Sequence, residues 1–490
     1  MTERRPCPPA PGPLEDYAAQ FDSLFRTLAQ RRNFRAYLQG LLLPRDRNKT
    51  LTALAGAEPI VEAQAAPVQG LQFFLSESTW DAEAVNARRL ELLLWDPATR
   101  PHERGVLVID DTGDRKAGTH TAHVAPQYLG SRGKVENGIV AVTSLWADER
   151  VYYPLHVRPY TPAEHFPKGQ RDPAFRTKPQ LAVELVAAAV AAAVPFRAVV
   201  ADCADGDSDA FLDALGRAGL PFVLALKPSR GTWAPIDQPH TALEAAAALD
   251  WGGPTHPGDG TPIERRFRDG HTETWWAAEV QLQPAAPEPV TRLVVATTDP
   301  GRFPPHTTWV LLTNLPRPGS RRAVKSGLAP ADLAEVVRVY GLRSWVEQGY
   351  KQVKHELGWA DFMVRSDRAI RRHWQLVCCA FAFCWRAWFM PEFGDSPPED
   401  GPPPTPTAPT RAPAGRGKKE QAHRSPHPPR RRRTPVLAGG AASGTRLVGS
   451  LDLPRALLAG VVRSAPTSGT AGAAGPGLHR PPTLHLYLRS

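Results

Sequence analysis

Apolar residues recur at helical spacing through the first hundred residues of the chain. They form two successive groups, each with intervals of three, one and three residues, which places them on one face of a helix. The two groups are Phe21, Leu24, Phe25, Leu28 and Phe34, Tyr37, Leu38, Leu41. A polar segment at 76–81 has the composition of a further helix start, and apolar residues follow it at similar spacing. Residues 15–100 are therefore predicted to form an all-helical N-terminal domain.

The pattern changes after Gly105 to short continuous apolar runs, which predict buried strands. The run 106–109 ends at Asp110, and the run 197–201 ends at Asp202. Further strands are predicted over 138–145, 151–157 and 222–226, with helices over 178–193 and 208–218. The order of strand, hairpin, helix, strand, helix and strand predicts a mixed α/β sheet for residues 105–230.

Helical periodicity is largely lost between residues 231 and 318. Alternating apolar and polar positions over 274–281, 292–298 and 308–313 predict a β-rich insertion. Helix is predicted again from Ala329 to about Trp388, within a C-terminal helical part at 329–390. The last 100 residues, 391–490, hold 18 of the 52 prolines and none of the 13 tryptophans, which predicts a low-complexity tail.

Length and composition exclude several classes of protein. A chain of 490 residues is too long for one ordinary domain, and 42% hydrophobic residues exclude wholesale disorder. No stretch of about 18 uncharged apolar residues occurs, and residues 1–13 are polar and proline-rich, so we expect a cytoplasmic protein without a membrane span or signal peptide. The five cysteines fit neither a disulfide framework nor a zinc site, and Cys378 and Cys379 are expected to be core thiols.

The positive charge of the chain is concentrated at its C-terminal end. The formal net charge is +10, but residues 391–490 contain 14 basic and 6 acidic residues and so contribute +8. Residues 1–390 carry the remaining +2. A net positive charge usually indicates a polyanionic partner, yet here it says little about the folded part.

Three carboxylates are candidates for a common site. Asp110 and Asp202 follow predicted buried strands, at the sheet edge where α/β proteins commonly bind ligands, and Glu347 lies on a later helix. Three converging carboxylates repel one another unless a cation is present. A site made of oxygen ligands suits Mg²⁺ or Mn²⁺. The alternative for each aspartate alone is a cap or turn residue at the end of a strand.

The helix around Glu347 adds a second pattern. Tyr340, Arg343, Glu347 and Lys354 are three, four and seven residues apart, which keeps them on nearly one helix face. A carboxylate flanked by cations can hold a metal while the cations bind phosphates. The alternative is a solvated charged helix.

With these residues the sequence resembles the DDE transposases of bacterial insertion sequences, in the subgroup with a Tyr-Arg-Glu-Lys signature. The signature segment, residues 340–358, is YGLRSWVEQGYKQVKHELG. Residues 108–118, VIDDTGDRKAG, with 127–128 and 133–137 after them, resemble the region around the first catalytic aspartate of the family. Residues 201–207, ADCADGD, resemble the region around the second, although the family often has an aromatic residue where Asp205 stands.

The resemblance implies a ribonuclease H-like core interrupted by the insertion, a helical N-terminal domain that helps to recognise transposon ends, and two-metal phosphoryl transfer on DNA. Asp110, Asp202 and Glu347 would bind two Mg²⁺ or Mn²⁺ ions. Asp111 is the rival for the first position, and Asp110 is preferred because Asp-x-Thr matches relatives better. Tyr340, Arg343 and Lys354 would contact DNA phosphates. Double-stranded DNA, both ends and target, would be bound by a homodimer associated with the nucleoid.

Two further groups of residues are candidates for DNA contacts. Relatives can excise DNA through a hairpin in which a flipped base stacks on an aromatic residue, and Trp275, Trp276 and Trp309 of the insertion are candidates. Packing in a β-rich core is the alternative for each. In the N-terminal region Arg45, Arg47 and Lys49 are candidates for phosphate contacts, with a solvated helix surface as the equal alternative.

The tail departs from the family, whose members continue with folded sequence that contains tryptophan. The cations at 418–419 and 430–433 fit a DNA-binding arm. However, when 437–466 is back-translated with GC-rich codons and shifted by one base, tryptophan-rich stretches like the family's ending can be obtained. Our hypothesis is a frameshift between about residues 391 and 436.

Three functions stay open on sequence alone. The leading one is a transposase that cleaves and joins DNA at the terminal inverted repeats of its own insertion sequence. The second is a non-catalytic DNA-binding remnant of such an enzyme, and the third is a general nuclease of the same fold. Metal-dependent nicking that requires the element ends would separate the first from the other two.

Overall fold

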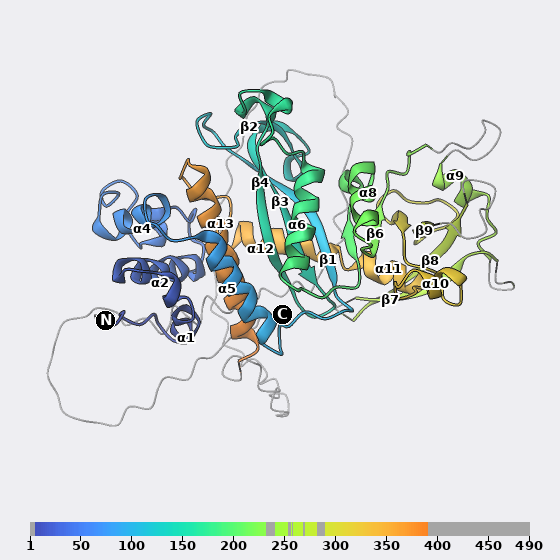
Figure 1. The fold of residues 1–490 in the computed structure, drawn as a ribbon, viewed down its shortest axis with the longest axis horizontal. Helices are drawn as coiled ribbons and strands as arrows, with labels where there is room; N and C mark the ends of the chain where they lie inside the picture. The colour runs from blue at the N-terminus through green and yellow to red at the C-terminus, as the bar shows by residue number, and fades with distance from the viewer. Residues whose placement is uncertain are drawn as a thin grey trace, which may run out of the picture.

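The computed structural model describes residues 5–231, 241–252, 256, 258–267, 270–281 and 290–390. Figure 1 shows N-terminal helices on one side, a central sheet flanked by helices, and a β-rich part on the other side. The N-terminal helices are α1 (Leu14–Ala19), α2 (Leu28–Leu42), α3 (Leu51–Leu54), α4 (Ala66–Ser76) and α5 (Ala82–Trp95), with a 3-10 turn at Asp22–Leu24. The predicted helical N-terminus is confirmed.

The N-terminal helices share a core with the last helix of the described chain, α13 (Asp367–Trp388). Helix α2 begins with a capping box, in which Thr27 and Gln30 exchange side-chain to backbone hydrogen bonds. Its apolar face then packs against α13, together with α4 and α5. Tyr37 of α2 donates or accepts a buried hydrogen bond with His373 of α13 over 2.8 Å. The helical N-terminus is thus anchored on the C-terminal helix of the core.

The central sheet has the strand order β4-β3-β1-β5-β6. Its strands are β1 (Val106–Arg115), β3 (Lys134–Ala147), β4 (Tyr152–Tyr160), β5 (Val199–Ala201) and β6 (Phe222–Ala225), and β2 (Ala125–Leu129) pairs with the start of β3. Strands β1, β5 and β6 are parallel, and β3 is antiparallel to β1. This mixed sheet confirms the predicted α/β class with a ribonuclease H-like core.

Helices cover the sheet. Helix α6 (Lys178–Ala191) packs against β1, β3 and β4, and α12 (Ser344–His355) packs against β1 and β4. The shorter helices are α7 (Cys203–Gly206), α8 (Asp209–Arg217), α10 (Arg321–Lys325) and α11 (Leu333–Gly341), with 3-10 turns at Gly130–Arg132, Ala163–His165 and Gly169–Arg171.

The insertion is β-rich, as predicted, and it continues the central sheet. It contains α9 (Ala242–Ala247), β7 (Thr261–Arg266), β8 (Thr272–Val280), β9 (Arg292–Thr297) and β10 (Thr308–Thr313). Strand β10 pairs antiparallel with β6, so the order extends as β6-β10-β9-β8-β7. A second apolar cluster that includes Trp251, Val280, Val295 and Val310 lies within the insertion.

Two sequence-based boundaries were wrong. Strand β1 does not end at Ile109 but continues to Arg115, because it pairs with β3 over its whole length while its parallel pairing with β5 covers only 107–109. The helix predicted over 329–388 is divided into α11, α12 and α13. It is interrupted at Gly341, where a Cβ atom would lie only 2.6 Å from an Arg265 nitrogen.

Several other expectations concern the whole chain. No helix within the described ranges has the length and apolar character needed to cross a bilayer. The five cysteines are free, and Cys378, Cys379 and Cys384 are buried in α13, whereas Cys7 and Cys203 are half-buried. Residues 391–490 lie outside the described residues, and with them both interpretations of the tail.

Candidate active site

Three carboxylates from three separate elements converge on one arginine. Asp110 lies within β1, Asp202 directly follows β5, and Glu347 lies in the first turn of α12. The Nη2 atom of Arg343 lies 3.2 Å from Asp110 Oδ2 and 3.4 Å from Asp202 Oδ2. Its Nη1 atom lies 3.4 Å from Glu347 Oε1. The fold thus brings together the three acidic residues that were predicted to share a site.

Each aspartate is held by a backbone hydrogen bond. Asp110 Oδ1 accepts from the backbone N–H of Asp111 over 2.8 Å. Asp202 Oδ1 accepts from the backbone N–H of Ala204 over 2.8 Å and so caps α7. The capping interpretation of Asp202 is therefore correct, and it leaves the second oxygen free for Arg343. One oxygen of each carboxylate fixes its orientation while the other faces the centre of the site.

Burial shifts the pKa values within this group. Burial raises the pKa of Asp110 to about 8; Arg343 opposes the rise, and the Asp202 charge adds to it. Burial likewise raises the pKa of Asp205 to about 7, with a further rise from Asp202. The nearby carboxylates hold the pKa of Arg343 above its usual range, although burial alone would lower it. One guanidinium therefore serves more acidic groups than it can neutralise, and an added cation would lower the pKa of Asp110.

Asp110 and Asp111 face opposite sides of the sheet, because successive side chains of a strand alternate. Asp110 faces Arg343 at the start of α12. Asp111 forms an ion pair of 2.6 Å with Lys178, the first residue of α6. This geometry favours Asp110 over Asp111 as the partner of Asp202 and Glu347, in agreement with the preference from sequence.

Helix α12 lies close against the sheet and so fixes the position of Glu347. Gly349 permits the approach, since a Cβ atom there would lie 3.2 Å from Leu145 of β3. One turn after Glu347, the hydroxyl of Tyr350 lies 2.6 Å from the Thr143 hydroxyl. Thr143 is the residue opposite Asp110 in the β1–β3 pair. Tyr350 thus links the helix that carries Glu347 to the strand register that holds Asp110.

The other signature residues occupy less open positions than their predicted role requires. Tyr340 is buried on α11, where its ring packs edge-on against Trp309 with centroids 4.9 Å apart. Burial raises the pKa of Tyr340 to about 12. Lys354 forms an ion pair of 2.7 Å with Asp114 and donates to the carbonyl oxygen of Gly113. The break between α11 and α12 also means that the four residues do not lie along one straight helix.

The candidate tryptophans lie in different environments. Trp275 is buried and packs against the half-buried Trp309, with centroids 4.1 Å apart. The guanidinium of Arg265 lies over both rings, 4.7 Å from Trp275 and 4.8 Å from Trp309. Trp276 packs against the second apolar cluster of the insertion instead. Trp309 also has a ring contact with Tyr340 of the signature.

Lys49 neither is placed to contact DNA phosphates nor lies on a solvated helix surface, so both interpretations of this lysine were wrong. Its side chain is buried, and its Nζ donates to the backbone carbonyls of Gly40, Leu41 and Leu43. Burial lowers the pKa of Lys49 to about 8. Arg45 forms an ion pair of 2.9 Å with Asp361, which lies between α12 and α13, and Arg47 donates to the Ala57 carbonyl. These cations hold loops together at the junction between the N-terminal helices and α12.

The chemistry of the converging residues fits a divalent metal ion, but their arrangement involves Arg343. Within the described ranges, no three acidic, histidine or cysteine side chains are grouped as a metal site. Asp110 and Asp202 nevertheless direct one oxygen each to the same Arg343 nitrogen. Carboxylate oxygens are the ligands that Mg²⁺ and Mn²⁺ prefer. The donor set therefore fits the ion, and the cationic group now between the carboxylates is a guanidinium.

Tyr350, Lys178 and Asp114 surround the site but were not identified from sequence. Each is fixed by a partner distant in the chain, at Thr143, Asp111 and Lys354 respectively. Neither a lysine at the start of a helix nor a tyrosine on an amphipathic helix belongs to a sequence pattern from which such a distant partner could be predicted. For Asp114 the run of polar residues after Asp110 is the available signal, but such a run also predicts the end of a strand.

Fold and site together define the class of the protein, a mixed α/β core in which acidic residues of the neighbouring parallel strands β1 and β5 meet at one arginine. A family model described as DDE superfamily endonuclease matches residues 20–288, more than half of the chain, including Asp110 and Asp202. The chain belongs to this superfamily.

A curated relative supports the same assignment. The chain is 31% identical over 363 residues to a protein of Microchaete diplosiphon named "Probable transposase for insertion sequence element IS701". The aligned region covers 74% of this chain and 84% of that protein. The resemblance to DDE transposases of insertion sequences, drawn from the three motifs, is confirmed.

Proposed function

We propose that the chain is a DNA transposase that cleaves and joins DNA at the terminal inverted repeats of its own insertion sequence. The observation that carries the proposal is the convergence of Asp110, Asp202 and Glu347 on Arg343. The membership of the DDE endonuclease superfamily and the transposase relative support it. Both partners of the reaction, the transposon end and the target, are double-stranded DNA.

The three carboxylates are the proposed ligands of two Mg²⁺ or Mn²⁺ ions. When bound, these ions would activate water or a 3′-hydroxyl for attack and stabilise the leaving oxygen in an in-line displacement. The chain's own contribution is to orient the ligands: Ala204 and Asp111 fix the aspartates through backbone N–H groups, and Tyr350 braces the helix of Glu347.

Arg343 is the proposed phosphate contact nearest to the cleaved bond. Its guanidinium faces the three carboxylates, and its Nε atom is buried without a hydrogen bond within the described residues. A guanidinium can bind a phosphate with two parallel hydrogen bonds. We propose that Arg343 turns from the carboxylates to the phosphate when metal and DNA bind, with Tyr340 and Lys354 as further contacts.

Trp309 is the proposed stacking platform for a flipped base, if excision passes through a hairpin. It is half-buried and contacts Tyr340, whereas Trp275 is buried beneath it. Changing Trp309 to Ala should reduce hairpin formation more than nicking, because stacking contributes about 1–3 kcal/mol per base. Trp276→Ala, which alters the other apolar cluster, is the control. Equal hairpin yields from both variants would contradict this role.

The decisive experiment measures strand cleavage by the purified full chain. A duplex that carries the element's own end and a duplex of equal length without it are incubated with Mg²⁺, with Mn²⁺ and with EDTA. Metal-dependent nicking of the first duplex alone is expected. Nicking of both would indicate a general nuclease, and binding without nicking would indicate a non-catalytic remnant.

The proposal includes a homodimer that holds both ends. The mass of the chain alone and of its complex with end DNA, measured by light scattering, tests this part separately. A complex with two chains is expected. A complex with one chain on each DNA would contradict the dimer but not the cleavage chemistry.

A further inference from the structure

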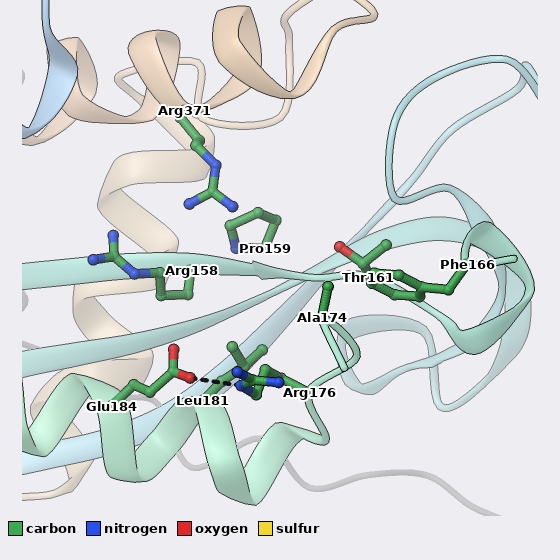
Figure 2. A pocket seen from close by; sticks show the side chains of 9 residues that line it. All are labelled: Arg158, Pro159, Thr161, Phe166, Ala174, Arg176, Leu181, Glu184 and Arg371. Carbon is green, nitrogen blue, oxygen red and sulfur yellow. Dashed lines mark hydrogen bonds and ion pairs between the residues drawn. The ribbon is translucent and has the colours of Figure 1, made fainter. Parts of the chain in front are cut away.

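A groove of about 380 Å³ lies on the opposite side of the sheet from Arg343, between β4, the segment before α6, and α13. We call it the arginine groove, because it is lined by Arg158, Arg176 and Arg371. Figure 2 shows that these arginines come from three different elements and surround a common space. Glu184 is the one acidic residue of the lining, while Glu83 and Asp367, the partners of Arg158 and Arg371, lie outside it.

Each arginine is held in place by an acidic residue but keeps donors for a further ligand. Arg158 binds Glu83 through Nη1, Arg176 binds Glu184 through Nε, and Arg371 binds Asp367 through Nε. The Nη2 atom of each makes no hydrogen bond within the described residues. All three side chains are partly exposed. The guanidinium groups are therefore oriented in advance and still able to donate to an anion.

The arginine groove lies beside the catalytic end of the sheet. Arg158 is opposite Val142 in the β3–β4 pair, and Val142 is opposite Asp111 in the β1–β3 pair. Arg158 is therefore two strands away from Asp111, or about 10 Å at the usual strand spacing. Arg176 precedes Lys178, the partner of Asp111, by two residues. Duplex DNA presents roughly six phosphates within 10 Å of helix axis, so a duplex at the carboxylates that also passes the edge strand β4 has phosphates within reach of the groove.

We propose that the arginine groove binds the phosphodiester backbone of duplex DNA beside the carboxylate site. The inference rests on the proposed function, since the DNA must first be a substrate of the carboxylates. The contact is with the backbone, because guanidinium groups that bind phosphate carry no base sequence information. It extends the DNA-binding surface from the α12 side of the sheet around β4 to the α6 side.

The test is the salt dependence of DNA binding by the full chain, measured by fluorescence anisotropy. The variants are Arg158→Gln, Arg176→Gln and Arg371→Gln. Each should weaken binding and reduce the slope of log K against log salt by about 0.9, the value for one phosphate contact. Arg88→Gln is the matched control, since Arg88 pairs with Glu91 on α5 outside the groove. It should leave the slope unchanged.

Glu184→Gln supplies a readout of opposite sign. Removing the one acidic residue of the lining should strengthen DNA binding, whereas a merely structural role of the Arg176–Glu184 pair predicts weaker or equal binding. Because both side chains are well exposed, this variant is expected to fold. Thermal melting of every variant separates loss of binding from loss of folding.

Two DNA duplexes test whether the arginine groove binds the end of the element or the target DNA. One duplex carries the element's own end, and the other is a duplex of equal length without it. If the variants lose equal affinity for both duplexes, the arginine groove binds any DNA that leaves the site. If they lose affinity for one duplex only, the groove binds the element's end or the target, according to which duplex is affected. If wild-type protein binds neither duplex, both the proposed function and the groove are wrong. If wild-type protein binds and all three variants match it, the groove alone is wrong.

Discussion

Two neighbouring aspartates of β1 have opposite environments. On the α12 side, Asp110 shares Arg343 with Asp202 and Glu347, so acidic groups outnumber the one cation. On the α6 side, Asp111 forms an ion pair of 2.6 Å with Lys178, which also lowers the pKa of the nearby Asp205. A one-to-one ion pair leaves no excess acidic group for a further cation, whereas an arrangement with excess acid binds a further cation favourably. The comparison indicates that the excess of acidic groups at Asp110, and not the ion pair at Asp111, favours a further cation.

The largest expected difference between the two sides is in cleavage. Asp110→Asn should lower the rate of nicking of end-containing duplex by at least about 10²–10³-fold, the usual effect of removing one electrostatic group from an active site. Asp202→Asn and Glu347→Gln should do the same while DNA binding is largely retained. Asp111→Asn is the matched control and should stay within a few-fold of wild type. A larger loss from Asp111→Asn than from Asp110→Asn would exchange their roles.

Asp110 and Asp111 also illustrate how far sequence reasoning reaches. The apolar runs 106–109 and 197–201 predict buried strands because a strand covered on both faces has few alternatives. The end of β1 was missed, since its pairing with β3 continues through polar residues. The close approach of Arg265 to Gly341, where α11 ends, joins the insertion to this helix, and no local pattern contains that contact.

The candidate site, like the fold, could be predicted from sequence only in part. Motif spacing identifies Asp110, Asp202 and Glu347 because the family resemblance covers these residues. It does not predict that Arg343 would lie between the carboxylates, since that contact joins α12 to two strands far away in sequence. The burial of Lys49 could not be predicted from the sequence either, because a lysine in a polar loop is normally exposed.

The second prediction concerns the cation on each side. Arg343→Ala should lower the free energy of unfolding in EDTA by about 1–3 kcal/mol, because buried carboxyl groups lose their charged partner. Mn²⁺ should then raise the melting temperature of this variant more than that of wild type. Lys178→Met is the control: its pair is about one-third exposed, so a smaller loss and no change in the Mn²⁺ effect are expected. Equal Mn²⁺ effects in all three proteins would contradict a metal site at Arg343.

Lys354 tests whether a cation paired within the fold also binds DNA. If Lys354 contacts a phosphate, Lys354→Met should reduce the salt slope of DNA binding by about 0.9. Asp114→Asn should strengthen binding, because it frees the ammonium group from its 2.7 Å partner. Anisotropy measurements on end-containing duplex give both values. Loss of stability in both variants with unchanged slopes would make the pair purely structural.

The smallest expected effect concerns Tyr350, which braces α12 against the strand opposite Asp110. Tyr350→Phe should lower the free energy of unfolding by about 0.5–1.5 kcal/mol, the usual contribution of one hydrogen bond, and should also slow nicking because Glu347 is less well fixed. Tyr37→Phe is the control, since the hydroxyl of Tyr37 also makes a side-chain hydrogen bond, 2.8 Å from His373 and away from the site, although Tyr37 is buried and Tyr350 is half-buried. It should show a similar loss of stability with an unchanged nicking rate. A parallel fall in nicking in both variants would mean that stability alone, and not the position of α12, controls the rate.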